Sequence, residues 1–440
     1  MEQSPLVIDN GSYTVKFGFA AVDDSVTKPY IAKNCLVKDK YGVSYLSNQV
    51  RNIKDISSAT IRRPHELGQL VSWELESHIW DYALYNPDEF DGFDVVDTAE
   101  RDLVLSEACM TIPELSKHSD QVIFEEYDFK SMYKTCVAGY MPFVSSEKYH
   151  IISGKETEDG ADDDTNKSKT ITTDDDNDVK IGPGLKTEYR DYQLVIDSGF
   201  DCTYIIPVIK GVPVYKAVKK LDIGGRFLNG LLKETLSFRH YNMMDESILV
   251  NEIKEKCLFI SPTSYFDSFK KKDQKGVVYA LPDFQTSVMG YVVDSKHKLA
   301  VNAQSITLKD ELFSIPETFF HPEIAQLLKP GIVETILESL SMLPELIRPL
   351  MVSNIVCTGG NLNLPHFGTR LCSELQRQLP TDWTCRLALS KGDSSLFGWE
   401  AMQTFAQTDI YKQFRVTREE YLEHGTDWCT KNRFGYQTWI

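Results

Sequence analysis

The 440-residue chain lacks the features that mark several broad classes of protein. It has no apolar run of membrane-spanning length, and its first residues, MEQSPLVIDN, lack the basic start and apolar core of a secretory signal. Its nine cysteines include no C-x-x-C pair, which disfavours a zinc site, and their odd number disfavours a disulfide framework. We therefore expect free, buried thiols in a protein of a reducing compartment, without a membrane partner.

Positive charge is also scarce. Lys and Arg number 47 against 64 Asp and Glu, which gives a net charge of -17. This excess of acid argues against broad attraction to DNA phosphates or anionic lipid and favours basic partners. The length exceeds what one hydrophobic core usually serves, so we expect two or more lobes.

Two stretches of the chain share one pattern. LVIDNGSYTVKFGF (residues 6–19) reads as a buried strand, a turn and an alternating strand, and LVIDSGFDCTYIIPVIKG (194–211) repeats it. Two such hairpins predict a duplicated lobe, with Asp9 and Asp197 placed to approach a metal and a phosphate chain from both sides. The plain alternative is that Val-Ile-Asp-x-Gly is a common strand ending. Tyr13 is bulky where close approach to a phosphate favours glycine.

A third segment fits the same cleft. Residues 353–379, SNIVCTGGNLNLPHFGTRLCSELQRQL, read as a buried strand, a Gly359-Gly360 turn and a helix. Paired glycines let a backbone lie against a flat ligand such as adenosine, although they also form ordinary turns.

These three segments, in this order, resemble the actin and actin-related superfamily, which also includes sugar kinases and the heat-shock-seventy ATPase. Longer stretches such as HELGQLVSWELESHIWDYALYN (65–86) and ITLKDELFSIPETFFHPEI (306–324) resemble actin itself. RRPHELGQL, FRHYNMMDE and HGTDWCTKNRFGY are similar to the sixth actin-related protein class, a nuclear subunit of the Swr-type chromatin-remodelling complex.

The resemblance implies an α/β actin-like ATPase fold, with two duplicated, ribonuclease H-like lobes around a nucleotide cleft. It also implies boundaries for the parts of the chain. We expect a first lobe at 1–32, 67–143 and 366–440, a small outer subdomain at 33–66, an acidic disordered insertion at 147–190, a second lobe at 191–220 and 309–365, and an outer helical subdomain at 221–308.

The insertion replaces a short connection of actin. Within residues 156–178, ten acids stand against two lysines, and few apolar residues interrupt them. Such a segment buries too little surface to repay its ordering, so a solvated loop is the simplest expectation. Contact with basic histone segments is the alternative.

The resemblance also implies which residues bind ATP or ADP with Mg²⁺. The glycines have a second reading as turn formers, and Lys254 with Glu255 has one as a charged helix face. Asp9 and Asp197 would hold the metal through water. The expected nucleotide-binding residues are Asp9, Gly11, Ser12, Tyr13, Lys16, Asp197, Gly199, Gly225, Lys254, Glu255, Gly359 and Gly360.

Departures from actin indicate that hydrolysis is lost. Actin orients the attacking water with a glutamine and a histidine. Here the segment SMYKTCVAGYMPF (131–143), read as a helix, offers only Val137, and Tyr204 stands at the histidine position. Phe200 replaces the acid of the second turn. Because losing positioned acid–base groups costs about 10²–10⁴-fold in rate, we expect any bound nucleotide to be structural.

The resemblance finally implies a non-catalytic scaffold subunit that helps a remodelling complex exchange a histone variant into nucleosomes. Its partners would be a remodelling ATPase and a small zinc-finger (HIT-type) subunit, with histones or the nucleosome met indirectly. We expect a nuclear location, with the cytoplasm as a second one. No filament is expected, because residues 34–48 are shorter than the actin loop that grips the next subunit. The alternative is a slow ATPase or a small-molecule kinase that uses Asp201 as base.

Overall fold

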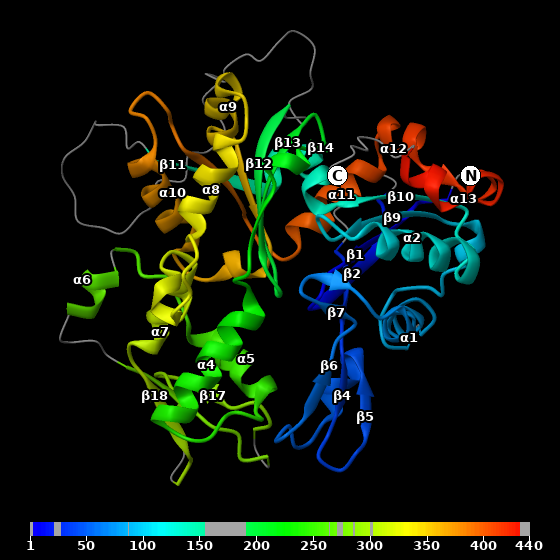
Figure 1. Cartoon of the computed structure of the whole chain (residues 1–440). Coiled ribbons are helices and arrows are strands. Elements are labelled where there is room, and N and C mark those ends of the chain that lie inside the picture. Colours follow the sequence, from blue (N-terminus) through cyan, green and yellow to red (C-terminus); the bar gives the residue numbers. More distant parts are fainter. Residues whose placement is uncertain are drawn as a thin grey trace.

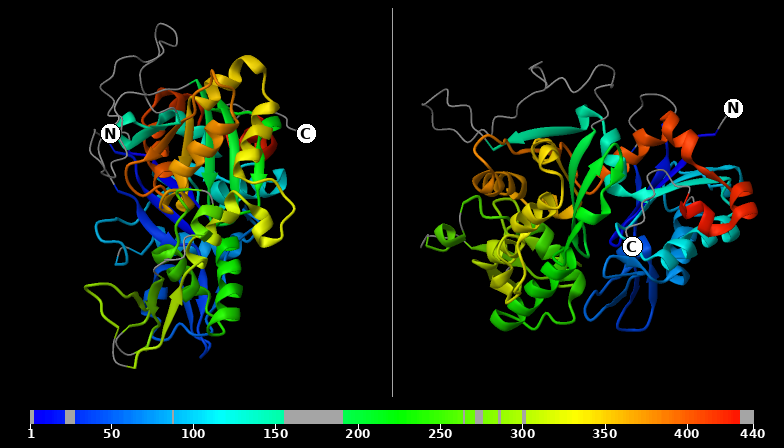
Figure 2. Two further views of the ribbon diagram at one scale, coloured as in Figure 1. Left: turned by 90° about the vertical axis from the view of Figure 1, so that its left-hand side faces the viewer. Right: turned by 45° about the horizontal axis from the view of Figure 1, so that its top comes forward.

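Two α/β lobes stand side by side, each with a smaller part at the same end of the molecule (Figures 1 and 2). The computed structural model describes residues 3–21, 28–86, 88–154, 191–263, 265–270, 276–284, 287–299 and 302–431. Most of the acidic insertion, residues 155–190, lies outside the described residues.

The first lobe is built on a six-stranded sheet with the order β21-β10-β9-β1-β2-β3. Its three central strands, β10, β9 and β1, run parallel, and β2 turns back antiparallel to β1. The strands are β1 (Leu6–Asn10), β2 (Thr14–Phe19), β3 (Tyr30–Lys33), β9 (Asp102–Glu107), β10 (Ser131–Cys136) and β21 (Val416–Thr417).

The second lobe repeats this arrangement in a sheet with the order β11-β20-β19-β12-β13-β14, and β15 also pairs with β13. Strands β20, β19 and β12 run parallel, β13 turns back from β12, and β11 flanks β20 antiparallel as β21 flanks β10. The predicted duplication and actin-like fold are therefore confirmed. The strands are β11 (Tyr149–Ser153), β12 (Tyr192–Ser198), β13 (Thr203–Ile209), β14 (Val212–Pro213), β15 (Lys219–Leu221), β19 (Ile355–Thr358) and β20 (Arg386–Ser390).

Helices cover both sheets. Each helix packs on its sheet through an apolar face, whose residues recur at helical spacing. On α10, Phe367, Leu371 and Leu375 recur every four residues and are fully buried, as the sequence predicts. The major helices are α1 (Trp73–Leu84), α2 (Pro113–Gln121), α8 (Ile332–Ser341), α9 (Arg348–Val352), α10 (Phe367–Gln378), α11 (Phe397–Ala406), α12 (Asp409–Phe414) and α13 (Arg418–Lys431).

The two outer parts differ in kind. Below the first lobe lies a small sheet of β4 (Leu36–Lys38), β5 (Ser44–Leu46) and β6 (Thr60–Arg62), followed by the hairpin β7 (His65–Glu66) and β8 (Gln69–Leu70). Below the second lobe lie helices and a second small sheet (Figure 1). These are α4 (Gly225–Arg239), α5 (Ser247–Cys257), α6 (Tyr265–Lys270), α7 (Glu311–Ser314), β16 (Val277–Ala280), β17 (Tyr291–Val292) and β18 (Ser305–Leu308).

The lobes share buried structure. One apolar cluster joins Val7 and Val104 of the first sheet to Val195 and Val356 of the second. Helix α11 lies in this cluster, and the Trp399 Nε1 donates to the Val7 carbonyl oxygen at 3.3 Å. The base of the cleft between the lobes is therefore one continuous core.

Two expected chain boundaries and one expected helix are wrong. The boundary at 366 is too early, because α10 and β20 belong to the second lobe through the pairing of β20 with β19. The insertion starts after 147, since Tyr149–Ser153 forms β11 along β20. Residues 131–136 form strand β10 rather than a helix, because this stretch is buried between β9 and β21, and helix α3 spans only Val137–Tyr140.

The expectation of free, buried cysteines holds. All nine cysteines are free and buried. Thr417 and Glu420 form a capping box at the start of α13, and Gly425 breaks that helix with a φ of 76°. Within the described ranges, no helix is long and apolar enough to cross a membrane.

Candidate functional site

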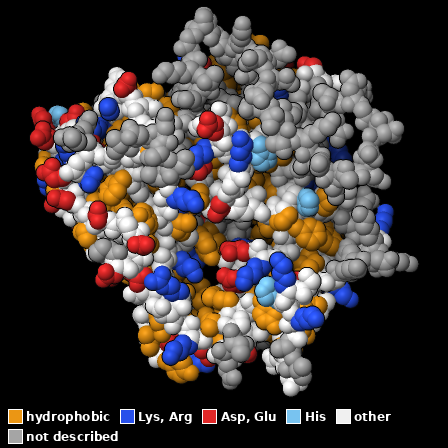
Figure 3. Space-filling model, turned by 180° about the vertical axis from the view of Figure 1, so that it is seen from behind, with side chains coloured by type: hydrophobic (Ala, Val, Ile, Leu, Met, Phe, Trp, Pro, Cys, Tyr) orange, Lys and Arg blue, Asp and Glu red, His pale blue; other side chains and the backbone are white. Residues whose placement is uncertain are grey.

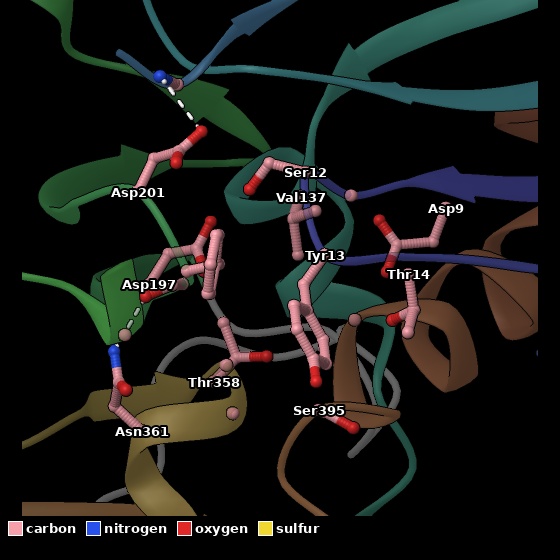
Figure 4. A pocket seen from close by; sticks show the side chains of 18 of the residues that line it. Asp9, Ser12, Tyr13, Thr14, Val137, Asp197, Asp201, Thr358, Asn361 and Ser395 are labelled. Carbon is pink, nitrogen blue, oxygen red and sulfur yellow. Dashed lines mark hydrogen bonds between the residues drawn. The ribbon is translucent and has the colours of Figure 1, made fainter. Parts of the chain in front are cut away.

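A cavity of about 550 Å³ lies between the two hairpins (Figure 4). This volume is within the range of small-molecule sites. All the residues predicted from the sequence to bind a nucleotide line it, together with the three replaced positions. The predicted residues are Asp9, Gly11, Ser12, Tyr13, Lys16, Asp197, Gly199, Gly225, Lys254, Glu255, Gly359 and Gly360.

The first hairpin holds its carboxylate in place. Asp9 and Lys16 are partners across the β1–β2 pair, and the Lys16 Nζ lies 3.0 Å from Asp9 Oδ2. The Ser106 hydroxyl, at the end of β9, donates to Asp9 Oδ1 at 2.7 Å. A Cβ on Gly11 would meet the Thr14 carbonyl oxygen at 2.9 Å, so the tight turn itself requires this glycine.

The second hairpin brings a carboxylate to face the first. Burial raises the pKa of Asp197, the Asp9 charge adds to the shift and Lys16 opposes it, and together they bring the pKa to about 7. Two carboxylates that face each other across a cavity fit a hydrated divalent cation, which prefers oxygen ligands. Among the described residues, no group of three His, Cys, Asp or Glu side chains forms a direct metal cage.

The raised pKa of Asp197 predicts a specific pH dependence of stability. In the folded protein the carboxyl keeps its proton up to pH of about 7, whereas the unfolded chain releases it near 3.8. Wild-type stability therefore falls across this window, by about 1.4 kcal/mol for each unit of pKa shift. We expect the melting temperature of Asp197→Asn to exceed that of wild type increasingly from pH 4.5 to 7, without metal or nucleotide. Asp94→Asn, in an exposed loop, is the control, and a constant difference would contradict the prediction.

Lys254 and Glu255, two of the expected residues, are joined through Asn251. The Lys254 Nζ donates to Asn251 Oδ1 at 3.0 Å, and the Asn251 amide donates to Glu255 Oε1 at 2.8 Å. Burial lowers the pKa of Lys254 to about 8, against the opposing Glu255 charge. A Cβ on Gly225 would meet the Lys254 Nζ at 3.1 Å. Both readings of the Lys254–Glu255 pair thus have support: the two side chains line the cavity and also form a polar network on α5.

The two glycines after β19 differ. Gly359 has a φ of 102°, and a Cβ there would lie 2.2 Å from the Ser198 carbonyl oxygen, so its role is close backbone packing. At Gly360 a Cβ would meet nothing closer than the Ser395 Cβ at 4.0 Å. Gly360 is therefore the one of the two that leaves room in the cavity.

The three replaced positions all line the cavity. Val137 begins α3 and projects into the cavity, as Figure 4 shows, while Phe200 and Tyr204 come from the second hairpin. Tyr204 is only 6% exposed. Asp201, the candidate base of a kinase, accepts from the Gly68 amide at 3.2 Å and lies 2.7 Å from the Arg226 Nε, so it is held by cleft-wall groups.

Sequence reasoning missed several residues of the site. Asn361 donates to the Gly199 carbonyl oxygen at 2.7 Å and so ties the glycine turn to the second hairpin (Figure 4). Its position directly after Gly359-Gly360 was the available signal. Asn251 lies three residues before Lys254 on α5 and shares its face. Arg63 and Ser106 contact the first hairpin only through tertiary packing.

Comparison with known proteins places this geometry in a family. The family model for actin matches residues 1–434. "Actin-like protein ARP6" of Saccharomyces cerevisiae is 64% identical over 449 residues and covers 100% of both chains. The Candida glabrata protein of the same name is 63% identical over 99% of both chains, and that of Candida albicans is 33% identical over 98% of both.

Proposed function

This chain belongs to the actin family, within its sixth actin-related class, and from that premise we propose that it is a non-catalytic scaffold subunit. Its setting would be a nuclear, ATP-dependent chromatin-remodelling complex that exchanges a histone variant into nucleosomes. The observation that carries the proposal is an actin-like cleft whose water-handling positions hold Val137, Phe200 and Tyr204. The fold is intact although these positions lack the groups that orient water in actin. We therefore infer that the cleft serves to bind a ligand and not to hydrolyse it.

Two features of the cleft fit a nucleotide that is bound but not hydrolysed. The facing carboxylates Asp9 and Asp197 suit Mg²⁺ through water, and Gly360 leaves room beside the cavity. Bound there, Mg-ATP or Mg-ADP would supply a charged bridge between the lobes. The chain's own contribution is to hold both hairpins on one continuous core. Asp201 is already engaged with Arg226, which argues against the kinase alternative.

The surface supports protein partners over nucleic acid. On the face in Figure 3, acidic and basic side chains are interspersed, with no continuous basic field among its described residues. We propose that histones or the nucleosome are met indirectly, through the partner subunits. Phe238 at the end of α4 is 92% exposed, and Tyr241 and Met244 beside it are 47% and 46% exposed. This motif, FRHYNMMDE, is one that resembles the sixth class, and exposed aromatic and Met side chains favour an interface.

Another aromatic cluster does not serve as an anchor. Phe319 and Phe320 are aromatic residues of a type favoured at interfaces, yet the two side chains are 0% and 5% exposed. They pack against Phe367 of α10, so they belong to the core of the second lobe. The surface of α4 is therefore the better candidate for docking.

Affinity purification from nuclear extract tests the proposal. A tagged copy is expected to recover a remodelling ATPase and a small zinc-finger subunit in stable, stoichiometric amounts. A Phe238→Ala/Tyr241→Ala copy should recover less of at least one partner, because it removes the exposed rings while leaving the core intact. Recovery of wild type only as a monomer or as a homopolymer would overturn the scaffold role.

A further inference from the structure

Two aromatic rings meet between the hairpins of the cleft. Tyr13 comes from the first turn and Phe200 from the second, and their ring centroids lie 5.0 Å apart at an interplanar angle of 35°. Figure 4 shows the Tyr13 side chain extending into the cavity, between the side that carries Asp9 and the side that carries Asp197. This contact therefore occupies space between the two lobes.

A cation covers both rings. The Arg63 guanidinium lies 4.7 Å from the centroid of Tyr13 and 4.7 Å from that of Phe200. Its Nη1 also donates to the carbonyl oxygens of Ser12, Tyr13 and Asn34, at 3.3, 3.2 and 2.9 Å. Arg63 is thus fixed to the first hairpin by hydrogen bonds and to the second by its contact with Phe200.

The Tyr13 hydroxyl reaches further into the second lobe. It accepts a hydrogen bond from the Asn251 amide at 2.8 Å, which joins the first hairpin to helix α5. Asn251 is 6% exposed, so this bond is sheltered from water. Burial raises the pKa of the Tyr13 phenol, and the Glu255 charge adds to the shift, so the hydroxyl stays neutral.

The loop after Arg63 makes further bonds across the cleft. The Gly68 amide donates to Asp201 Oδ2 at 3.2 Å, and Arg226 Nη2 donates to the His65 carbonyl oxygen at 3.2 Å. Lys220 Nζ donates to the Leu67 carbonyl oxygen at 2.9 Å. Protein groups alone therefore connect the lobes along this edge.

We propose that Tyr13, Phe200 and Arg63 form a clasp that joins the two lobes without a nucleotide and must part before a phosphate chain can lie between the hairpins. The contacts described above carry the joining of the two lobes. The competition with a phosphate chain rests on the proposed nucleotide site. Clasp and phosphates compete for the same space, so the clasp lowers the apparent affinity of the cleft for Mg-ATP.

The first arm of the test measures lobe closure in the full-length protein without nucleotide. We expect Tyr13→Ala and Phe200→Ala each to lower the melting temperature by about 2–4 °C, and the double variant to lower it by less than their sum. Phe238→Ala, which removes an exposed ring outside the cleft, should leave it unchanged. The backbone amides of residues 65–70 should exchange hydrogen faster in the clasp variants than in wild type. A general loss of stability would speed exchange throughout the protein and not in these residues alone.

The second arm titrates Mg-ATP and follows the same melting temperature. The concentration that gives half the maximal shift should fall by about tenfold in Tyr13→Ala. Tyr13→Phe keeps the ring and loses only the bond to Asn251, so it should fall between wild type and Tyr13→Ala.

The outcomes separate the two proposals. Wild-type melting and exchange in both Tyr13→Ala and Phe200→Ala would overturn the clasp. Faster exchange with no response to Mg-ATP in any variant would support the clasp and overturn the nucleotide site. Equal Mg-ATP midpoints in wild type and Tyr13→Ala would overturn the competition between ring and phosphate.

Discussion

The purified protein is expected to release phosphate from Mg-ATP no faster than a blank without protein. Hydrolysis needs a group that orients the attacking water and a route for its proton. In this cleft the corresponding places hold Val137 and Tyr204, which are apolar or buried. Loss of such groups costs about 10²–10⁴-fold, which would bring a slow ATPase to background.

A phosphate-release assay with actin as positive control makes this measurement. Asp9→Ala serves as the matched control, because it removes a carboxylate of the cleft that Lys16 and Ser106 hold in place. Turnover comparable to that of actin, abolished by Asp9→Ala, would contradict the prediction. It would place the slow-ATPase alternative ahead of the scaffold.

The second prediction concerns a buried ion pair of the second lobe. The Arg370 side chain is 3% exposed, and its Nη2 lies 3.0 Å from Oε1 of Glu317, which is 0% exposed. Arg370 also donates to Glu374 and to the Ser261 carbonyl oxygen. Arg370→Met would leave the Glu317 carboxylate buried without its cation. We expect a loss of about 3–5 kcal/mol in the free energy of unfolding at pH 8, measured by urea titration.

The same helix offers a matched control. Arg377 pairs with Glu374 but is 69% exposed, so Arg377→Met should cost less than about 0.5 kcal/mol. Burial raises the pKa of Glu317 to about 7 even with Arg370 opposing, and losing that cation raises it further. Glu317 therefore takes up a proton as the pH falls, and the cost of Arg370→Met should shrink between pH 8 and pH 5. A cost that is independent of pH, or equal for both variants, would contradict this account.

The parts of the fold that could be predicted from the sequence are those with a local pattern of buried and polar residues. Each hairpin is specified by a buried run, an Asp-containing turn and an alternating strand, and the register pairs Asp9 with Lys16 and Asp197 with Tyr204. The twelve residues expected to bind a nucleotide, which all line the cavity, came from the resemblance to actin. The recurrence of the hairpin pattern was enough to predict the duplication. These features depend on contacts that are close in sequence or on a repeated motif.

Features that depend on tertiary packing were missed. Residues 131–136 read as a helix because periodicity alone does not separate a buried strand from a buried helix. A sequence also does not show whether aromatic side chains face a partner or a core, and only the structure shows that Phe319 and Phe320 are buried. The ring contact of Tyr13 with Phe200 joins residues of two different hairpins, so only the assembled cleft shows it.

The chain forms the second lobe before it returns to complete the first, and this order has a consequence for biosynthesis. The first sheet receives its edge strand, β21, and its covering helix, α11, from the last part of the chain, and Trp399 bonds to Val7, 392 residues away. A ribosome would therefore have to release nearly the whole polypeptide before the first lobe could close. Until then, strands β1 and β9 expose apolar surface, and such slow, long-range closure invites aggregation.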